Sequence, residues 1–268
     1  MGLLCADNSS TVAPYGQEDI PELRSVFEWP HLMDNAVFLD TQCRLTVLSS
    51  VKHPVFDASS VDRMPTVLGG FISRHVYDSK LLTEHAIHTQ TCCRFVDVSN
   101  GEEIKKGVSW MVRKTLPSIS PFLMLTTCPI QNEGEVKAAV QIARRYIRDG
   151  EDFKIITPYD AQRNAIENAL KTAGLTWENT VFNVDSFQGN EEDNIIVSIV
   201  RTSNPGFMKS RRRTNVMLSR CKKNMMILTH REFLRYWDVA KTLVGQFAKE
   251  HVPKTGWVTL DDLTFYRW

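Results

Sequence analysis

Two short segments in the second half of the chain carry side chains that suit phosphate chemistry. Residues 184–193 read Val-Asp-Ser-Phe-Gln-Gly-Asn-Glu-Glu-Asp, and residues 212–220 read Arg-Arg-Thr-Asn-Val-Met-Leu-Ser-Arg. The guanidinium of Arg220 is planar and permanently charged, which suits a γ-phosphoryl group in transfer. Arg220 could equally form a structural salt bridge on a solvated basic face, which is the usual fate of a helix arginine. Taken singly, the segments leave both interpretations open.

The turn at 185–189 follows an apolar stretch, 180–184, that predicts a short strand. In an open parallel sheet, ligands gather at the carboxyl ends of the strands, because loops and helix N-termini bring free backbone N–H groups there. We therefore expect this turn at the ligand-binding edge of a sheet. The alternative is an ordinary polar turn in which Gly189 has a positive φ and Glu191 is solvated.

Predicted strands and helices alternate from about residue 133 onward. The expected strands are 153–156, 180–184, 194–201 and 225–229, and the expected helices are 133–148, 161–172, 214–221 and 231–250. This alternation predicts a parallel α/β sheet with right-handed crossovers and helices on its faces. The first 130 residues are less regular, although 93–98 alternates as a strand does.

The composition is that of an ordinary soluble globular protein. The chain has 268 residues, 43% of them hydrophobic and 24% charged, with a formal net charge of +1. This length allows one or two domains with a substantial core. The net charge does not decide the partners, because a nucleic-acid binder needs only a local basic patch. The nearest such patch is Lys-Ser-Arg-Arg-Arg at 209–213.

The six cysteines are scattered, without a Cys-x-x-Cys pair or a histidine at zinc-finger spacing. We therefore expect no metal site and no disulfide framework. The first residues lack the basic start and the apolar run of a secretory signal. The uncharged run 115–132 contains three prolines and is too short and too broken to span a bilayer. We expect an intracellular protein, cytoplasmic or nuclear, with no membrane partner.

In this order, and with an apolar strand between them, the two segments resemble motifs V and VI of superfamily 1B helicases, the branch that contains the nonsense-mediated-decay helicase. The resemblance implies a RecA-like fold of the P-loop NTPase kind, here the second domain of a helicase. It assigns the arginine-finger role to Arg220, with Arg213 and Asn215 in support. Glu191, the acidic residue that follows Gly189, would contact the nucleotide ribose.

The same resemblance implies contacts with nucleic acid. Ser186 and Gln188, within motif V, would face it. Residues 157–162, Thr-Pro-Tyr-Asp-Ala-Gln, resemble the family's Thr-Pro-Tyr-x-x-Gln element, so Thr157 and Gln162 would face it as well. Asp160 could equally be no more than the N-cap of the following helix.

Residues 42–45, Gln-Cys-Arg-Leu, resemble the family's Gln-Tyr-Arg-Met. In the family, the tyrosine of this motif stacks on the base and the arginine touches the γ-phosphate. Gln42 and Arg44 match the motif, whereas Cys43 has no ring to stack on a base. The resemblance therefore places Gln42 and Arg44 at the nucleotide and predicts weakened base stacking.

A second partial match, Asp-Arg-Met-Pro at 62–65, makes Arg63 the alternative to Arg44 at the γ-phosphate. The motif is thus split by 45–61, and 111–131 fills a place where the family has a short connection. We interpret both segments as insertions or translated introns, which a transcript that lacks them would support.

A self-sufficient motor also needs a Gly-x-x-x-x-Gly-Lys-Ser/Thr loop (Walker A) and an Asp-Glu pair for magnesium (Walker B). No such loop and no Asp-Glu pair after an apolar strand occur in this sequence. The family places both in its first RecA-like domain, and residues 1–50 resemble the end of that domain. We expect the start of the second domain with its insertions at 51–131, the RecA-like core at 132–250 and a tail at 251–268.

The sequence therefore predicts the C-terminal domain of an ATP-dependent RNA or DNA helicase. ATP and Mg²⁺ would bind between this domain and a first RecA-like domain that carries Walker A and B. The chain alone would hold neither and would be inactive, and single-stranded RNA or DNA is its expected partner. The alternative is a non-catalytic module, derived from a helicase, that binds nucleic acid or a protein. An unrelated α/β nucleotide-binding regulator ranks last, because the chain has no phosphate-cradling loop.

Overall fold

A computed structural model of the chain describes residues 64–83, 85–105 and 130–265. Several predicted features lie outside these residues, so the structure does not test those predictions. They are the nucleotide contacts Gln42, Arg44 and Arg63, the segment 45–61 and most of the segment 111–131.

Within the described residues, six strands form one sheet in which every neighbouring pair is parallel. The strand order is β5-β4-β6-β7-β1-β8. The strands are β1 (Cys93–Asp97), β4 (Phe153–Thr157), β5 (Val181–Asn183), β6 (Glu192–Ser198), β7 (Cys221–Thr229) and β8 (Trp257–Thr259). The predicted α/β fold with a parallel sheet is confirmed.

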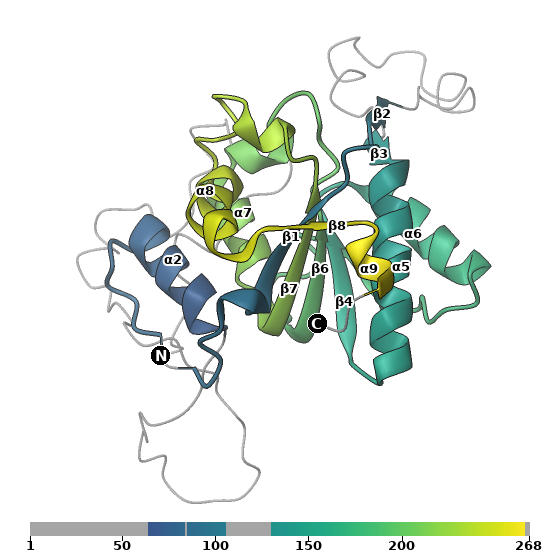
Figure 1. The fold of residues 1–268 in the computed structure, drawn as a ribbon, viewed down its shortest axis with the longest axis horizontal. Helices are drawn as coiled ribbons and strands as arrows, with labels where there is room; N and C mark the ends of the chain where they lie inside the picture. Colours follow the sequence, from purple (N-terminus) through teal and green to yellow (C-terminus); the bar gives the residue numbers. More distant parts are fainter. Residues whose placement is uncertain (1–63, 84, 106–129, 266–268) are drawn as a thin grey trace, which may run out of the picture.

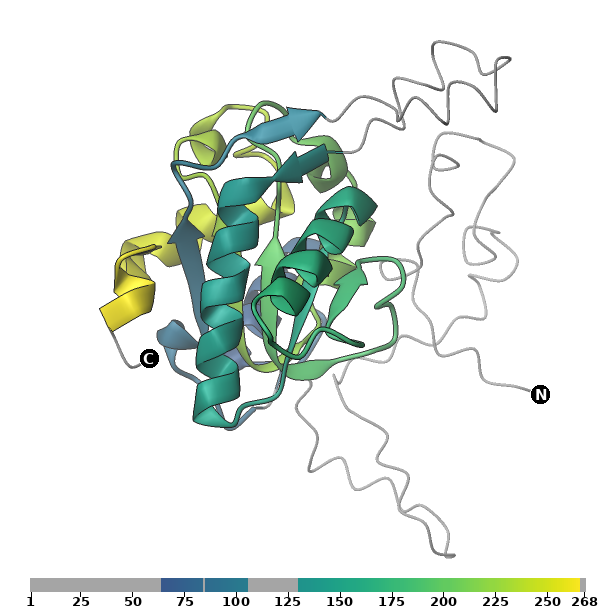
Figure 2. The same cartoon turned by 90° about the vertical axis from the view of Figure 1, so that its right-hand side faces the viewer.

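Helices cover both faces of the sheet (Figures 1 and 2). One face carries α2 (Thr66–Val76), α7 (Arg211–Leu218) and α8 (Leu243–Thr255), and the other carries α5 (Glu133–Asp149), α6 (Asp160–Thr172) and α9 (Asp262–Phe265). The buried apolar side chains form two clusters to match, one between the sheet and each helical layer. The sheet is therefore the middle layer of three.

Shorter elements connect these layers. β2 (Glu103–Lys105) and β3 (Ile130–Asn132) pair antiparallel, and β3 leads directly into α5. Short 3-10 helices precede β1 and α7 and follow β7. They are η2 (Gln90–Cys92), η3 (Gly206–Lys209) and η4 (Phe233–Arg235).

The ends of α5 follow from its sequence. The side chain of Asn132 caps the helix by accepting a hydrogen bond of 3.1 Å from the backbone N–H of Glu135. Gly150 ends the helix with φ of 72°, a left-handed conformation that glycine adopts without a Cβ clash, and its N–H reaches the carbonyls of Ile147 and Tyr146. The predicted helix and its glycine cap are confirmed.

The apolar run in β6 explains the position of that strand. Ile195, Ile196 and Val197 alternate between the two faces of the sheet, and none of them is exposed to solvent. A strand that is apolar on both faces belongs inside a parallel sheet covered by helices. The strand ends at Ser198, earlier than predicted, and Val200 just beyond it has φ of 72°, which a β-branched residue rarely adopts.

Two predicted helices differ from the structure. The helix predicted at 214–221 begins at Arg211, because Ser210 caps it by accepting from the N–H of Arg213, and it ends at Leu218. Arg220 therefore lies between α7 and β7 and does not project from the helix. The closing helix predicted at 231–250 is replaced by η4 and turns as far as α8, whose N-cap is Thr242.

A third difference concerns the start of α6. Tyr159, and not Asp160, is the N-cap residue, and it makes no side-chain cap. Asp160 is the first helical residue, and its carboxylate accepts a hydrogen bond of 3.1 Å from Asn183 at the end of β5. The carboxylate thus connects α6 to the neighbouring strand.

Two helical glycines give a matched test of this packing. A Cβ at Gly245 of α8 would lie 2.2 Å from the carbonyl oxygen of Val239 and 2.7 Å from the Cα of Ala240, whereas a Cβ at Gly70 of α2 would meet only the end of the Arg74 side chain at 3.5 Å. We expect Gly245→Ala to lower the free energy of unfolding by about 1–3 kcal/mol. Gly70→Ala should raise it by about 0.5–1 kcal/mol. Urea unfolding measures both, and equal effects would contradict the close approach at Gly245.

Candidate functional site

A bidentate ion pair joins the two segments that carry the predicted site. Arg213, in the first turn of α7, is 4% exposed. Its Nε donates to Oδ1 of Asp185 at 3.1 Å, and its Nη2 donates to Oδ2 of the same carboxylate. The guanidinium also lies 5.0 Å from the ring centroid of Phe207. Two parallel charge-assisted bonds fix direction as well as distance, so α7 holds the turn after β5 in one orientation.

The turn at 185–189 holds one buried aromatic side chain between exposed polar residues. Phe187 is buried at 2% exposure, with its ring centroid 5.0 Å from that of Phe182. Ser186, Gln188 and Gly189 around it are exposed, and Gly189 has φ of 88°. The positive φ of Gly189 is the one expected of an ordinary polar turn, while the exposure of Ser186 and Gln188 leaves both side chains accessible to a ligand.

Arg220 lies at the opposite end of the sheet from Asp185. Its backbone carbonyl accepts a hydrogen bond of 3.1 Å from the N–H of Glu192, at the point where β6 and β7 begin. By contrast, Asp185 follows β5 at the carboxyl edge, where Asn183 pairs with the last residue of β4. The segment 185–191 therefore runs from one end of the sheet to the other and links the two arginines.

The guanidinium of Arg220 points into the protein. The residue is 3% exposed, and its Nε donates to the carbonyl of Val216 at 2.7 Å. Its Nη2 donates to Ser219 Oγ at 2.7 Å, and its Nη1 reaches the carbonyl of Asn190 at 3.4 Å. These bonds connect the end of α7 to the loop that carries Gly189 and Glu191. Contact with a phosphate requires this side chain to turn outward.

Thr157 and Gln162 are buried, in contrast to their predicted position facing nucleic acid. Neither is exposed to solvent. Gln162 accepts from the backbone N–H of Asn132 at 2.8 Å and donates to the carbonyl of Asn132 at 3.1 Å and to Ser198 Oγ at 3.0 Å. The amide of Gln162 therefore joins the start of α6 to the start of α5 at Asn132 and to the end of β6 at Ser198.

A buried carboxyl group, Glu135, completes this polar layer and was not among the predicted site residues. Its Oε2 accepts from Ser198 Oγ at 2.6 Å and from the backbone N–H of Val200 at 2.9 Å. Burial raises the pKa of Glu135 to about 8, although both hydrogen bonds act to lower it. The carboxyl group is thus largely protonated at neutral pH.

The sequence did carry a signal for Glu135. Asn132 followed three residues later by Glu135 has the pattern of a capping box, in which the acidic side chain bonds the N–H of the N-cap residue. Here Gln162 takes the N–H of Asn132, which leaves the carboxyl group of Glu135 for Ser198 and Val200. The capping-box pattern thus indicates where the helix begins, whereas the hydrogen-bond partners of Glu135 depend on the tertiary structure.

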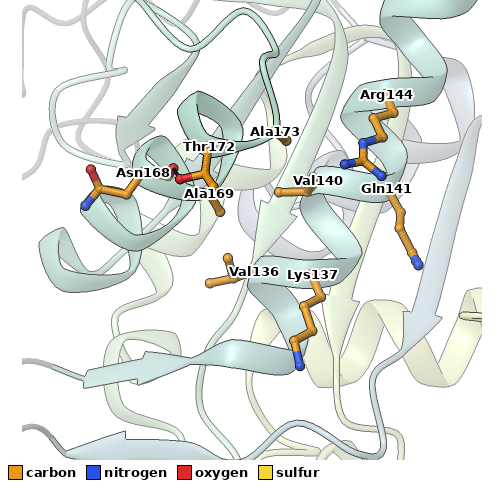
Figure 3. Close-up of a pocket in the computed structure, with 9 residues that line it drawn as sticks. All are labelled: Val136, Lys137, Val140, Gln141, Arg144, Asn168, Ala169, Thr172 and Ala173. Carbon is orange, nitrogen blue, oxygen red and sulfur yellow. Dashed lines mark hydrogen bonds between the residues drawn. The ribbon is translucent and has the colours of Figure 1, made fainter.

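A groove lies between α5 and α6, on the other face of the sheet from α7 (Figure 3). Its volume is about 620 Å³. Valines and alanines form its floor, and polar side chains point outward along its rim. Its lining residues are Val136, Lys137, Val140, Gln141, Arg144, Asn168, Ala169, Thr172 and Ala173. None of the predicted site residues lines this groove, so it is separate from the candidate site.

Clustered metal ligands and membrane-spanning helices are absent from the part of the chain that the structure describes. There, no three or more His, Cys, Asp or Glu side chains come together in a way that could hold a metal ion. Among the same residues, no helix is long and apolar enough to cross a bilayer.

The domain has three layers around a parallel sheet, and an arginine of the crossover helix between β6 and β7 pairs with a glycine-containing turn. These features define an α/β domain of the RecA-like kind. The sequence model of one protein family, described as an AAA domain, matches residues 59–232. Since this match covers more than half of the chain, the chain belongs to that family.

Similarity to individual proteins agrees with this family. The chain is 26% identical over 193 residues to an uncharacterized ATP-dependent helicase of Methanocaldococcus jannaschii, a match that covers 68% of this chain and 28% of that protein. It is 28% identical over 204 residues to Regulator of nonsense transcripts 1 of Caenorhabditis elegans, covering 71% and 18%. It is 31% identical over 110 residues to DNA polymerase alpha-associated DNA helicase A of Saccharomyces cerevisiae, covering 39% and 16%.

These relatives confirm the resemblance to the C-terminal region of superfamily 1 helicases of the nonsense-mediated-decay kind. The chain spans less than a third of the length of each of them. It is a domain derived from an ATP-dependent helicase.

The pKa of Glu135 makes a prediction about stability. The unfolded acid ionises near its ordinary value of 4.5, whereas the native acid stays protonated up to about pH 8. Between these values the native state binds more protons, so stability falls as pH rises, by up to about 1.4 kcal/mol per pH unit. Glu135→Gln keeps one carbonyl oxygen, which can accept the bonds from both Ser198 and Val200, and the amide cannot ionise. We expect the variant to gain stability relative to the parent between pH 5 and pH 8, measured by urea unfolding, and a constant difference would contradict the raised pKa.

The Arg213 and Asp185 pair can be measured with a double-mutant cycle. We expect Arg213→Gln and Asp185→Asn to show a coupling energy of about 1 kcal/mol, reduced from that of a fully buried pair because Asp185 is 36% exposed. The half-buried pair of Arg163 and Glu167, one turn apart on α6 and joined by a single bond of 3.3 Å, is the control and should give about 0.3–0.5 kcal/mol. A smaller coupling at Arg213 than in this control would show that the pair does not orient the turn.

Proposed function

We propose that this chain is the second RecA-like domain of an ATP-dependent superfamily 1 helicase that acts on single-stranded RNA or DNA. The bidentate pair of Arg213 and Asp185 carries the proposal, because it ties motif VI to motif V in one rigid unit. The domain would complete an ATP site whose Walker A and Walker B residues belong to a first RecA-like domain. Alone it would not hydrolyse ATP.

The roles of the site residues follow from their positions. Arg220 would act as the arginine finger after its side chain turns outward, and Arg213 would hold the loop that faces it. Gly189 and Glu191 would lie against the nucleotide, because Gly189 is exposed and adds no side chain to the loop surface. Of the proposed nucleic-acid contacts, Ser186 and Gln188 have exposed side chains. Thr157 and Gln162 would support that surface from below.

The residues predicted outside the described part of the chain complete the proposed nucleotide site. Gln42, with Arg44 or Arg63 as a second γ-phosphate contact, would come from the region before β1. The proposed division of the chain at 50, 131 and 250 follows the family motifs. An intracellular location, cytoplasmic or nuclear, belongs to the same proposal.

The donor set of this domain fits the phosphates of ATP better than it fits the metal. Arg213 and Arg220 are cationic and suit phosphate oxygens. Mg²⁺ prefers carboxylate and phosphate oxygens, and the family supplies its carboxylates through Walker B of the first RecA-like domain. Mg²⁺ would therefore be held by the first domain, while this domain contacts the nucleotide from the other side.

A non-catalytic binding module remains the second candidate, and one observation favours it. The guanidinium of Arg220 is 3% exposed and bonded to Val216, Ser219 and Asn190, as a structural arginine would be. A module that no longer takes part in ATP hydrolysis would keep Arg220 in this buried position. The two candidates differ in whether nucleotide draws the side chain outward.

ATP turnover by the purified chain, measured with and without oligo(U) and oligo(dT), tests the proposal. We expect no turnover above background, together with binding of either oligonucleotide that weakens as salt is raised. Turnover that nucleic acid stimulates and Arg220→Ala abolishes would show instead that the chain holds its own phosphate site.

Mixing the chain with the first RecA-like domain of the archaeal relative tests the arginine-finger role. If ATP turnover is restored, Arg220→Ala should reduce it by about 10³-fold or more. Arg148→Ala removes an exposed arginine of α5 and should leave turnover unchanged. An Arg220→Ala complex as active as the parent would favour the non-catalytic module.

A further inference from the structure

Two neighbouring aromatic side chains are exposed on the segment that follows β7. Trp237 is 74% exposed and Tyr236 is 50% exposed, more than the 39% of Ile147 and, for Trp237, more than any other large apolar side chain of the described residues. The ammonium group of Lys241 lies 4.9 Å from the ring centroid of Trp237. A tryptophan buries more apolar area than almost any other side chain, so one held in solvent beside a cation marks a surface that meets a ligand.

The backbone under these rings is firmly anchored. Phe233, Leu234 and Val239 on either side are buried, and the N–H of Ala240 donates to the carbonyl of Tyr236 at 2.8 Å. The ring of Tyr236 stands edge-on to that of Phe233, with centroids 6.0 Å apart. The rings are therefore presented from a fixed base, so little ordering entropy is lost when a ligand binds.

This surface lies at the same edge of the sheet as the turn at 185–189. The segment leaves β7 at its carboxyl end, where the N–H of Arg231 donates to Asp97 at the end of β1 at 3.0 Å. Phe233 and Phe187 belong to one apolar cluster, on the face that carries α7 and α8. Three strand spacings separate β5 from β7 in the sheet, which is about 14 Å.

The charges around the rings suit a polyanion. Lys241 and Arg231 are exposed. The nearby acids are engaged within the protein, since Glu232 accepts from Arg235 at 2.9 Å and Asp238 accepts from the N–H of Val239 at 3.0 Å. Exposed rings beside cations are the usual platform for single-stranded nucleic acid, because every base has a π-face that can stack.

We propose that Tyr236, Trp237 and Lys241 form a base-stacking platform that extends the nucleic-acid path of this domain beyond the motif V turn. The rings stack on one or two bases, and Lys241 contacts the adjacent phosphate. The proposal rests on the proposed function, since it takes single-stranded RNA or DNA as the ligand. It adds a contact that depends on stacking and tolerates any base sequence.

Fluorescence anisotropy with end-labelled oligo(U) and oligo(dT) tests the platform. We expect Trp237→Ala to raise Kd by about 5- to 100-fold without changing the slope of log K against log salt. Lys241→Ala should instead reduce that slope by about 0.7, the value for one phosphate contact on a single strand. Trp237→Phe keeps a ring and should stay within about threefold of the parent.

Ile147→Ala is the matched control, because Ile147 is an exposed apolar residue at 39% on α5, on the other face of the sheet. We expect it to leave Kd unchanged. Circular dichroism and urea unfolding of each variant separate loss of binding from loss of fold.

Photo-cross-linking of the unmodified chain to an oligonucleotide that contains 5-iodouridine locates the contact directly. We expect the cross-linked peptide to contain Tyr236 or Trp237. Binding that Trp237→Ala leaves intact, with cross-links only elsewhere, would overturn the platform and leave the proposed function standing; the exposed rings would then be a surface for a protein. If the parent chain binds neither oligonucleotide, the proposed nucleic-acid function fails together with the platform.

Discussion

The buried polar layer at the carboxyl end of the sheet is the constraint on which the arrangement of this domain depends. Gln162 bonds both Asn132 and Ser198 there, and Glu135 joins them through Ser198. Hydrogen bonds in a dry interior are strong, and a polar group that loses its partner there is costly. The starts of α5 and α6 therefore keep one position relative to the end of β6. The loops that leave this edge start from fixed points.

The other face of the sheet uses charge in place of this neutral network. Arg213 and Asp185 meet where the turn borders solvent, and the Asp185 side chain is 36% exposed, so the pair stays partly hydrated. Glu135 has no such access, and its carboxyl group takes up a proton. One sheet thus supports two kinds of polar contact, which differ because one set is covered by a helix and the other borders a solvated turn.

Much of the fold could be predicted because its signals are local. The glycine cap at Gly150, the positive φ at Gly189 and the apolar run of β6 depend on neighbouring residues alone. The burial of Gln162 could not be predicted, since a polar side chain at the start of a helix looks the same whether solvent or a second helix lies beside it. The same holds for Glu135, whose partners come from a strand more than sixty residues away.

The position of Arg220 was missed for a related reason. The helical spacing of its neighbours continues past Leu218, but strand pairing with β6 at Cys221 requires the chain to leave the helix before that point. Tertiary pairing overrode local preference. Likewise, the apolar residues of 231–250 are spaced as in a helix, yet η4 and its turns intervene before α8.

The inward position of Arg220 would couple two parts of the proposed nucleotide site energetically. Its guanidinium supplies a donor to the carbonyl of Asn190, the residue between Gly189 and Glu191. A phosphate that draws the side chain away removes that donor, and the loop must find water or a ligand in its place. Binding at the phosphate end and binding at the ribose end of the proposed site would therefore be thermodynamically linked, and by reciprocity each would change the affinity of the other by the same factor. In the proposed site, a nucleotide that reaches both ends would therefore bind with an affinity that the two ends, taken separately, do not give.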